Sequence, residues 1–192
     1  LHPEGAPALI AGAGYEYRAV SSPGRLYPIA EPFGRLENRA GGIDDGDMKT
    51  GSMVTAFVNA YYEAAGVPVV GVSASKGGSR IDSWQPGGSF LTDAIDRMRD
   101  ACRFLDANDY RIRHRLMLWC QGESDGDAAK PGPQYQREFT CMLDAMLHEG
   151  IERKNFFPFQ NPHFLSSPSG PSAACPLHQP VNLLVREVIL RH

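Results

Sequence analysis

The sequence lacks two features that would assign it to a membrane or nucleic-acid class. No apolar run approaches the ~18 residues that a membrane-spanning helix needs. The net charge of -3 and the pI near 6.1 provide no excess of positive charge for a nucleic acid or an anionic membrane. We therefore expect neither a membrane span nor a nucleic-acid partner, and the oligomeric state stays open.

The sequence also lacks a cysteine framework. Its four cysteines form no C-x-x-C pair, and their spacing relative to the histidines is not that of zinc ligands. We expect Cys102, Cys120 and Cys141 to be buried free thiols, with disulfides as the alternative that stays open. The first residue is Leu1 rather than Met, so a signal peptide would lie outside the sequence, and cytoplasmic and secreted locations both stay open.

The rest of the composition is that of a soluble globular domain. A length of 192 residues suffices for one domain with a sizeable core, and the 42% hydrophobic and 21% charged residues are ordinary values. From Thr50 onward, helical and strand patterns alternate. This alternation predicts an α/β fold with a parallel sheet and right-handed crossovers.

Three segments carry apolar residues at helical spacing. The first ends at Gly66, which the pattern predicts as a C-cap, and the third is closed by Gly150. Ser89 is the predicted N-cap of the second. The inner positions of the three stripes are Met53, Phe57, Ala60, Tyr61 and Ala64; Ile95, Met98, Cys102 and Leu105; and Tyr135, Phe139, Met142, Leu143, Met146 and Leu147.

Two apolar runs without alternation, residues 67–73 and 113–120, predict buried strands. Residues 1–49 show neither period, and we interpret them as a long ordered surface loop. Residues 15–18 and 31–34 are its expected anchors.

The pattern breaks after Glu152. Prolines stand where a central strand would need amide donors, and only residues 181–190 regain an apolar pattern, as one short helix or strand. We therefore divide the chain into a domain at 1–152 and an atypical Pro/Ser-rich, poorly ordered tail at 153–192. One hypothesis for the tail is a change of reading frame, which the coding DNA would test.

The most distinctive stretch is residues 119–125, Trp-Cys-Gln-Gly-Glu-Ser-Asp, which follows the second predicted strand. An amide and carboxylates at the carboxyl end of a buried strand lie where open α/β sheets place their sites. The alternative interpretation is an acidic, solvated turn. A second notable block is Gly71–Trp84, which contains Gly77-Gly78-Ser79.

Together these two blocks resemble the sialate O-acetylesterase-like branch of the SGNH hydrolases, carbohydrate esterases that remove acetyl groups from sugars. The resemblance extends from about Gly12 to about Glu152. It implies a three-layer α/β/α sandwich of flavodoxin-like type, with a parallel sheet that lacks its first strand. The implied partner is an acetylated carbohydrate or another small acyl ester, and the resemblance implies that neither a metal nor an organic cofactor is needed.

The resemblance also implies roles for particular residues. The Gly78 backbone N–H and the Gln121 side-chain amide would donate to the negative oxygen of a tetrahedral intermediate. The alternative for Gly77 and Gly78 is a tight turn with positive φ. We expect Glu123 and Asp125 to brace the loop.

Three further residues of the glycine block are candidates for supporting the site or binding substrate. Ser79 belongs to the turn itself. Trp84 is either a wall on which a sugar stacks or an ordinary core aromatic. Arg80 either meets a substrate carboxylate or pairs with Asp82 or Glu123 at the surface.

The catalytic triad is not identified. Enzymes of this type need a serine nucleophile, a histidine base and an acid, and we find neither the family's nucleophile block nor its Asp-x-x-His block. Ser52 is the predicted N-cap of the first helix, Ser73 and Ser75 are conceivable nucleophiles, and His148 lies on a last helical turn. The histidines of the tail, none with an Asp three residues earlier, are His163, His178 and His192.

Two other functions stay open. One is a non-catalytic carbohydrate-binding or scaffold remnant of the same fold. The other is a nucleotide or phosphate binder that uses the turn at residues 75–79 as an anion nest, although the Walker spacing is not met.

Overall fold

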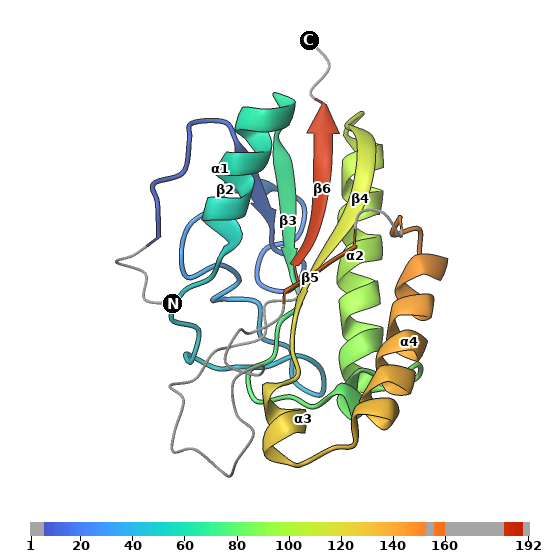
Figure 1. The fold of residues 1–192 in the computed structure, drawn as a ribbon. Coiled ribbons are helices and arrows are strands. Elements are labelled where there is room, and N and C mark those ends of the chain that lie inside the picture. The colour runs from blue at the N-terminus through green and yellow to red at the C-terminus, as the bar shows by residue number, and fades with distance from the viewer. Residues whose placement is uncertain (1–5, 153–155, 160–182, 190–192) are drawn as a thin grey trace.

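The computed structural model describes residues 6–152, 156–159 and 183–189, with side chains described up to Glu152 (Figure 1). The helices are α1 Val54–Ala65, α2 Ser89–Ala107, α3 Glu123–Asp127 and α4 Gly132–His148, with a 3-10 turn, η2, at Ile81–Trp84. The strands are β1 Gly14–Tyr17, β2 Leu26–Pro28, β3 Val69–Ser73, β4 Arg111–Cys120, β5 Phe156–Phe159 and β6 Leu183–Ile189.

The strands form one mixed sheet. Their order is β2-β1-β3-β6-β4-β5, and β6 lies antiparallel between β3 and β4. β1 pairs in parallel with β3, β4 pairs in parallel with β5, and β2 pairs antiparallel with β1. The α/β class is therefore correct, whereas a sheet that is parallel throughout is not what the chain forms.

The sheet departs from a parallel one at two places. The chain reverses between β1 and β2 over residues 18–25, a connection short enough for an antiparallel pair. Both strands lie within residues 1–49, for which the sequence predicted only a loop. The second place is β6, whose segment was predicted as a short helix or strand and which enters the centre of the sheet in the opposite direction to its neighbours.

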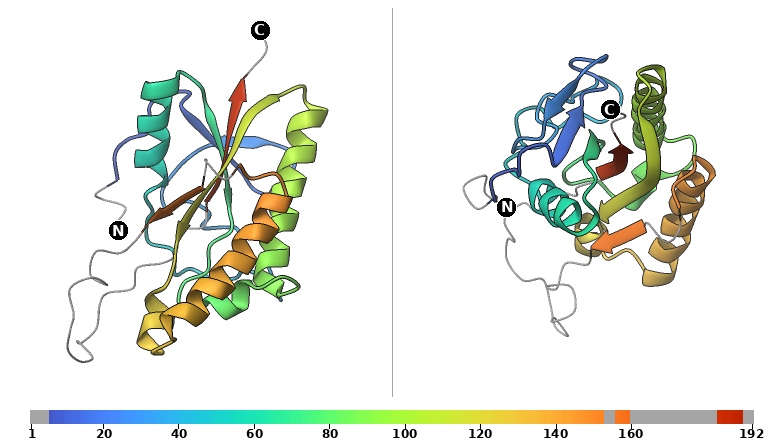
Figure 2. Two further views of the ribbon diagram at one scale, coloured as in Figure 1. Left: turned by 45° about the vertical axis from the view of Figure 1, so that its right-hand side comes forward. Right: turned by 90° about the horizontal axis from the view of Figure 1, so that it is seen from above.

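Helices cover both faces of this sheet (Figure 2). Because side chains alternate along a strand, Val69 packs in the cluster that contains Val58 of α1. Its neighbour Val70 packs in the other cluster, with Met98 of α2 and Met142 of α4. The unbroken apolar pattern of β3 is thus explained by burial on both faces.

The helix ends agree with the sequence to within about one residue. Gly66 caps α1 in the left-handed conformation with φ of 68°, as predicted. The cap of α2 is Gly88, one residue before the predicted Ser89. Ser52 lies one residue before Met53, which is the cap of α1.

Buried charges tie the long segment between β2 and α1 to the rest of the molecule. Arg97 of α2 is 0% exposed and binds both carboxylate oxygens of Asp93, at 3.0 and 2.7 Å. Its guanidinium also donates to the main-chain oxygens of Glu37, Ile43 and Ser73. A charged residue therefore occupies the inner face of a helix whose sequence stripe is apolar.

A second buried cation lies beside the end of β3. Lys49 donates to the Gly34 oxygen at 3.0 Å and to Ser73 Oγ at 3.3 Å, and burial lowers its pKa. Glu16 of β1 accepts the Gly34 N–H at 3.0 Å, and burial raises the pKa of its carboxyl group. The predicted anchors at residues 15–18 and 31–34 are thus bound to each other.

Residues beyond Glu152 contribute β5 and β6 to the sheet. β5 contains Pro158 and lies at the sheet edge, where a residue without an N–H is tolerated. Most of the predicted tail lies outside the described residues, including His163, His178 and His192. The division at Glu152 and the frame hypothesis stay predictions.

Candidate functional site

The two sequence motifs meet at one edge of the sheet. β3 and β4 both run antiparallel to β6, so their carboxyl ends lie at the same edge. The turn at residues 75–79, here called the glycine turn, follows β3, and Gln121 follows β4 directly. The amide Nε2 of Gln121 lies 3.0 Å from the main-chain oxygen of Ser79, to which it donates. The predicted proximity of the two motifs therefore holds.

Within the turn, Gly78 has φ of +64°, a conformation that glycine adopts without strain. The neighbouring Gly77 N–H donates to Asp45 Oδ1 at 2.9 Å. The Gly78 N–H makes no hydrogen bond to any part of the chain that the structure describes. The turn is thus a tight one, and it also presents an unpaired backbone donor.

The side chain of Gln121 is held at every polar atom. Besides Ser79, its Nε2 contacts Asp125 Oδ2 at 2.5 Å, so both amide hydrogens are donated. Its Oε1 accepts from the Tyr135 hydroxyl at 2.9 Å. Burial raises the pKa of Tyr135 to about 12, so the phenol keeps its proton at neutral pH. These contacts fix both the position and the orientation of the amide.

Asp125 is the centre of this arrangement and is 2% exposed. Its Oδ2 accepts the Ile81 N–H at 2.9 Å, which joins the loop after β4 to the turn after β3. Its Oδ1 lies 3.1 Å from Lys130 Nζ. Glu123 is half-buried at the first turn of α3, a short helix that the sequence did not predict.

Lys130 carries the balancing positive charge. It contacts Glu138 closely, and its Nζ lies 3.6 Å from Asp82. Burial opposes its charge, but the bonds to Glu138 and Asp125 outweigh that effect and raise the pKa of Lys130. The same contact lowers the pKa of Glu138. The positive charge of Lys130 therefore lies directly beside the Asp125 carboxyl group behind Gln121.

Three other predicted site residues, Ser79, Trp84 and Arg80, occupy supporting positions. Trp84 is 1% exposed, its ring meets that of Trp119 edge-on at 5.6 Å, and its indole N–H donates to Ser79 Oγ at 3.0 Å. Of its two interpretations, the structure favours the core aromatic. Arg80 is 53% exposed and lies 3.5 Å from Asp82, which matches the surface ion pair.

The structure adds three residues that the sequence did not single out, namely Tyr135, Lys130 and Asp45. Tyr135 belongs to an apolar helical stripe and therefore reads as an ordinary core residue. Lys130 and Asp45 lie in polar loops, where burial cannot be read from the pattern. The only available signal was that Asp45 stands in an acidic cluster, residues 44–47.

No nucleophile is evident beside the turn in the described part of the chain. Ser73, Ser75 and Ser79 are 1%, 7% and 8% exposed, so none presents an open hydroxyl. Ser52 donates to Glu31 Oε1 at 2.8 Å, in keeping with a structural role. Burial raises the pKa of the Cys120 thiol to about 11, which keeps it from forming a nucleophilic thiolate at neutral pH.

The three cysteines that the structure describes are free thiols, as predicted, but Cys141 is exposed rather than buried. Cys102 and Cys120 are partly buried. Over the same residues, no group of three or more potential metal ligands is found. None of the helices described is both long and apolar enough to cross a membrane.

The two histidines in the described residues lie elsewhere. His114 is on β4, roughly 20 Å along the strand from Gln121, and lies 3.4 Å from Glu152. His148 is on the last turn of α4, as predicted, again roughly 20 Å from Tyr135 along the helix. Neither lies beside the glycine turn.

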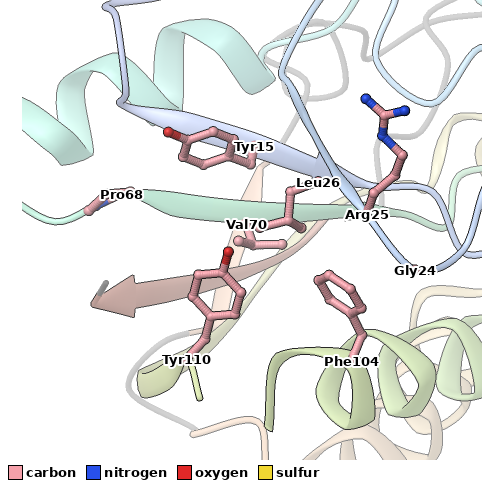
Figure 3. Close-up of a pocket in the computed structure, with 8 residues that line it drawn as sticks. All are labelled: Tyr15, Gly24, Arg25, Leu26, Pro68, Val70, Phe104 and Tyr110. Atoms are coloured by element: carbon pink, nitrogen blue, oxygen red, sulfur yellow. The ribbon is translucent and has the colours of Figure 1, made fainter. Parts of the chain in front are cut away.

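A hollow of about 370 Å³ lies at the opposite end of β3 (Figure 3). The rings of Phe104 and Tyr110 face the strands across it, whereas the guanidinium of Arg25 turns away from them. This hollow is distinct from the polar site. Its lining residues are Tyr15, Gly24, Arg25, Leu26, Pro68, Val70, Phe104 and Tyr110.

A mixed sheet with helices on both faces and polar groups at the ends of β3 and β4 defines an α/β protein whose candidate site lies at the carboxyl ends of these two strands. The family model described as carbohydrate esterase, sialic acid-specific acetylesterase, matches residues 36–157. The chain therefore belongs to this carbohydrate esterase family, and the predicted resemblance is confirmed. The match contains both the glycine turn and Gln121. No curated protein matches the chain.

Proposed function

We propose that the chain is a serine esterase of the SGNH type that hydrolyses acetyl esters on sugars. Family membership supports the reaction class and the acetylated carbohydrate as substrate. Helices on both faces of the sheet support the three-layer arrangement of that fold. The observation that carries the proposal is the contact between Gln121 and the glycine turn, at 3.0 Å.

In this proposal, the Gly78 N–H is the first donor to the developing oxyanion. Gln121 is the second, and its amide must exchange one present acceptor for the substrate oxygen. The Ser79 carbonyl is the acceptor to be replaced, because a negatively charged oxygen accepts a stronger hydrogen bond than a neutral carbonyl does. Asp125, neutralised by Lys130, then keeps the amide in place through its other hydrogen.

The remaining site residues support this arrangement. Gly77 and Ser79 shape the turn, and Glu123 begins the short helix that carries Asp125. Arg80, exposed at the surface beside the turn, is the group available to a substrate carboxylate. Trp84 packs beneath Ser79. The nucleophile and the histidine base are not among the groups that the structure brings to the turn.

Hydrolysis of 4-nitrophenyl acetate and of an O-acetylated sialic acid tests the proposal. Removing one oxyanion donor lowers kcat by about 100-fold to 1000-fold. We expect Gln121→Ala to show a loss of this size, and Gln136→Ala, on the exposed face of α4, to match the unchanged protein. Equal rates for Gln121→Ala and the unchanged protein would show that the amide takes no part.

A specific observation favours a second function, the non-catalytic carbohydrate binder. Ser75 and Ser79, the serines closest to the glycine turn after β3, are buried, and neither described histidine is near the turn. Calorimetric titration with the same O-acetylated sugar separates the two proposals. Binding without release of acetate would support the binder, and release of acetate would support the esterase.

A further inference from the structure

The donors on one side of Gly78 are already occupied by a carboxylate of the chain itself. Asp45 Oδ1 lies 2.9 Å from the Gly77 nitrogen and 3.2 Å from Lys76 Nζ. Asp45 is 5% exposed and comes from the long segment before α1. A residue far away in sequence therefore binds the first half of the glycine turn.

An ammonium group next to a backbone N–H in a glycine turn is the composition of an anion site. Here the anion is Asp45, so a phosphate would have to displace a buried carboxylate and overcome its negative charge. This argues against the phosphate or nucleotide binder that the turn suggested by sequence. It also leaves the Gly78 N–H as the donor available to an incoming oxygen.

We propose that Asp45 is a positioning residue, which holds Lys76 and Gly77 so that the Gly78 N–H alone of the two glycine donors faces the substrate. This inference rests on the proposed esterase function. It assigns the loop at residues 44–47 a role in the reaction, although none of its groups touches the substrate.

The way in which Asp45 is held fits this role. Its own N–H donates to Asn38 Oδ1 at 2.9 Å, which fixes the loop that carries it. Its second oxygen, Oδ2, is buried and has no hydrogen-bond partner in the described residues. An asparagine would satisfy the Gly77 N–H without burying a charge, so a simple brace does not require a carboxylate. The negative charge of Asp45 both holds Lys76 and excludes other anions from the turn.

Asp44 provides a matched control. It is adjacent in sequence and also accepts a backbone N–H, that of Gly46, at 2.9 Å. Unlike Asp45, it is exposed. Replacing Asp44 therefore removes a carboxylate from the same loop without touching the glycine turn.

The first test does not depend on activity. Inorganic phosphate is titrated into the 15N-labelled protein, and the Gly77 and Gly78 amide signals are followed. We expect Asp45→Ala to bind phosphate at least about 10-fold more tightly than the unchanged protein, with the Gly77 signal moving, because an anion site is vacated. Asp44→Ala should behave like the unchanged protein. Equal phosphate affinity in Asp45→Ala and the unchanged protein would overturn the inference.

The second test measures kcat and KM separately on 4-nitrophenyl acetate. A donor displaced by about 1 Å costs on the order of 100-fold in rate. We expect Asp45→Ala to lose about this much in kcat with little change in KM, and Asp45→Asn, which still accepts the Gly77 N–H but has no charge to hold Lys76, to recover part of it. A lower melting temperature with unchanged kcat in both variants would contradict the inference.

The outcomes separate this inference from the function on which it rests. If the unchanged protein hydrolyses no ester, the esterase proposal fails and Asp45 has no reaction to serve; the phosphate titration then decides only whether Asp45 fills the turn. If Asp45→Ala does not fold, hydrogen exchange of the Gly77 amide is compared between Asp45→Asn and the unchanged protein. Unchanged exchange would support a hydrogen bond from the Gly77 N–H to residue 45 in the variant, and faster exchange would contradict it.

Discussion

At its carboxyl end, strand β3 meets buried charged groups, and at its amino end it meets a group of partly exposed rings. Ser73 receives hydrogen bonds from Arg97 and Lys49, both buried. Val70, by contrast, lines the hollow with Phe104 and Tyr110. Hydrogen bonds are directional and apolar contacts are not, so the carboxyl end fixes backbone positions that the amino end leaves adaptable. The proposed chemistry lies at the end where geometry is fixed.

Arg97→Ala is expected to give the largest effect on this comparison. It removes the buried partner of the Asp93 carboxylate, which then keeps only the 39% exposed Arg39 at 2.9 Å, and removing one partner of a buried pair costs about 3–5 kcal/mol. Urea denaturation followed by circular dichroism measures the change. Arg103→Ala on the same helix removes a 71% exposed arginine and is the control, with no measurable change expected. If Arg97→Ala changed the free energy of unfolding as little as Arg103→Ala does, the contrast between the two ends of β3 would not hold.

Tyr135→Phe is expected to have an intermediate effect. It removes the hydroxyl that donates to Gln121 Oε1, and one such bond contributes about 1 kcal/mol at neutral pH. The neutral phenol is favoured in the folded state, because burial raises the pKa of Tyr135 to about 12. Its contribution is therefore complete below about pH 10, the unfolded value, and is lost as the pH rises from there to about 12.

Denaturation curves at pH 8 and pH 11 test this sign. The stability difference between the unchanged protein and Tyr135→Phe should be larger at pH 8 than at pH 11. A difference that grows with pH would mean that the phenol ionises more easily in the folded protein than in the unfolded chain.

Tyr110→Phe, at the amino end, is expected to have the smallest effect. The hydroxyl of Tyr110 has no hydrogen-bond partner in the part of the chain that the structure describes, and the residue is partly exposed. Such substitutions usually change stability by less than about 0.5 kcal/mol. Tyr135→Phe and Tyr110→Phe, measured in the same denaturation assay, compare one tyrosine hydroxyl near each end of β3. A loss as large as that of Tyr135→Phe would show that the hollow is also fixed by hydrogen bonds.

Local patterns were sufficient to locate the three long helices, α1, α2 and α4, and the two motifs. Gly66 ends α1 because the left-handed conformation there favours glycine, and sequence shows this directly. Gln121 directly follows the buried strand β4. Because β3 and β4 end at the same edge of the sheet, Gln121 lies beside Ser79 in the turn after β3. Both inferences need only the residues next to one another in the chain and the rule that places sites in open sheets.

Contacts between distant segments could not be read in the same way. The direction of β6 depends on which strands it pairs with, and its sequence favours no particular partner. Asp44 and Asp45 are identical neighbours, yet only Asp45 is buried against Gly77. Which carboxylate enters the interior is decided by the path of the whole loop, so sequence reasoning that treated the loop as a surface feature missed it.

Pro158 has a consequence for how copies of this protein meet one another. It lies in β5, the last strand of the sheet in the order that the structure shows, and it has no backbone N–H. Proline in an edge strand is one of the features that disfavour the addition of a strand from a second molecule. This feature belongs to the β5 edge, whereas β2 forms the other edge of the sheet.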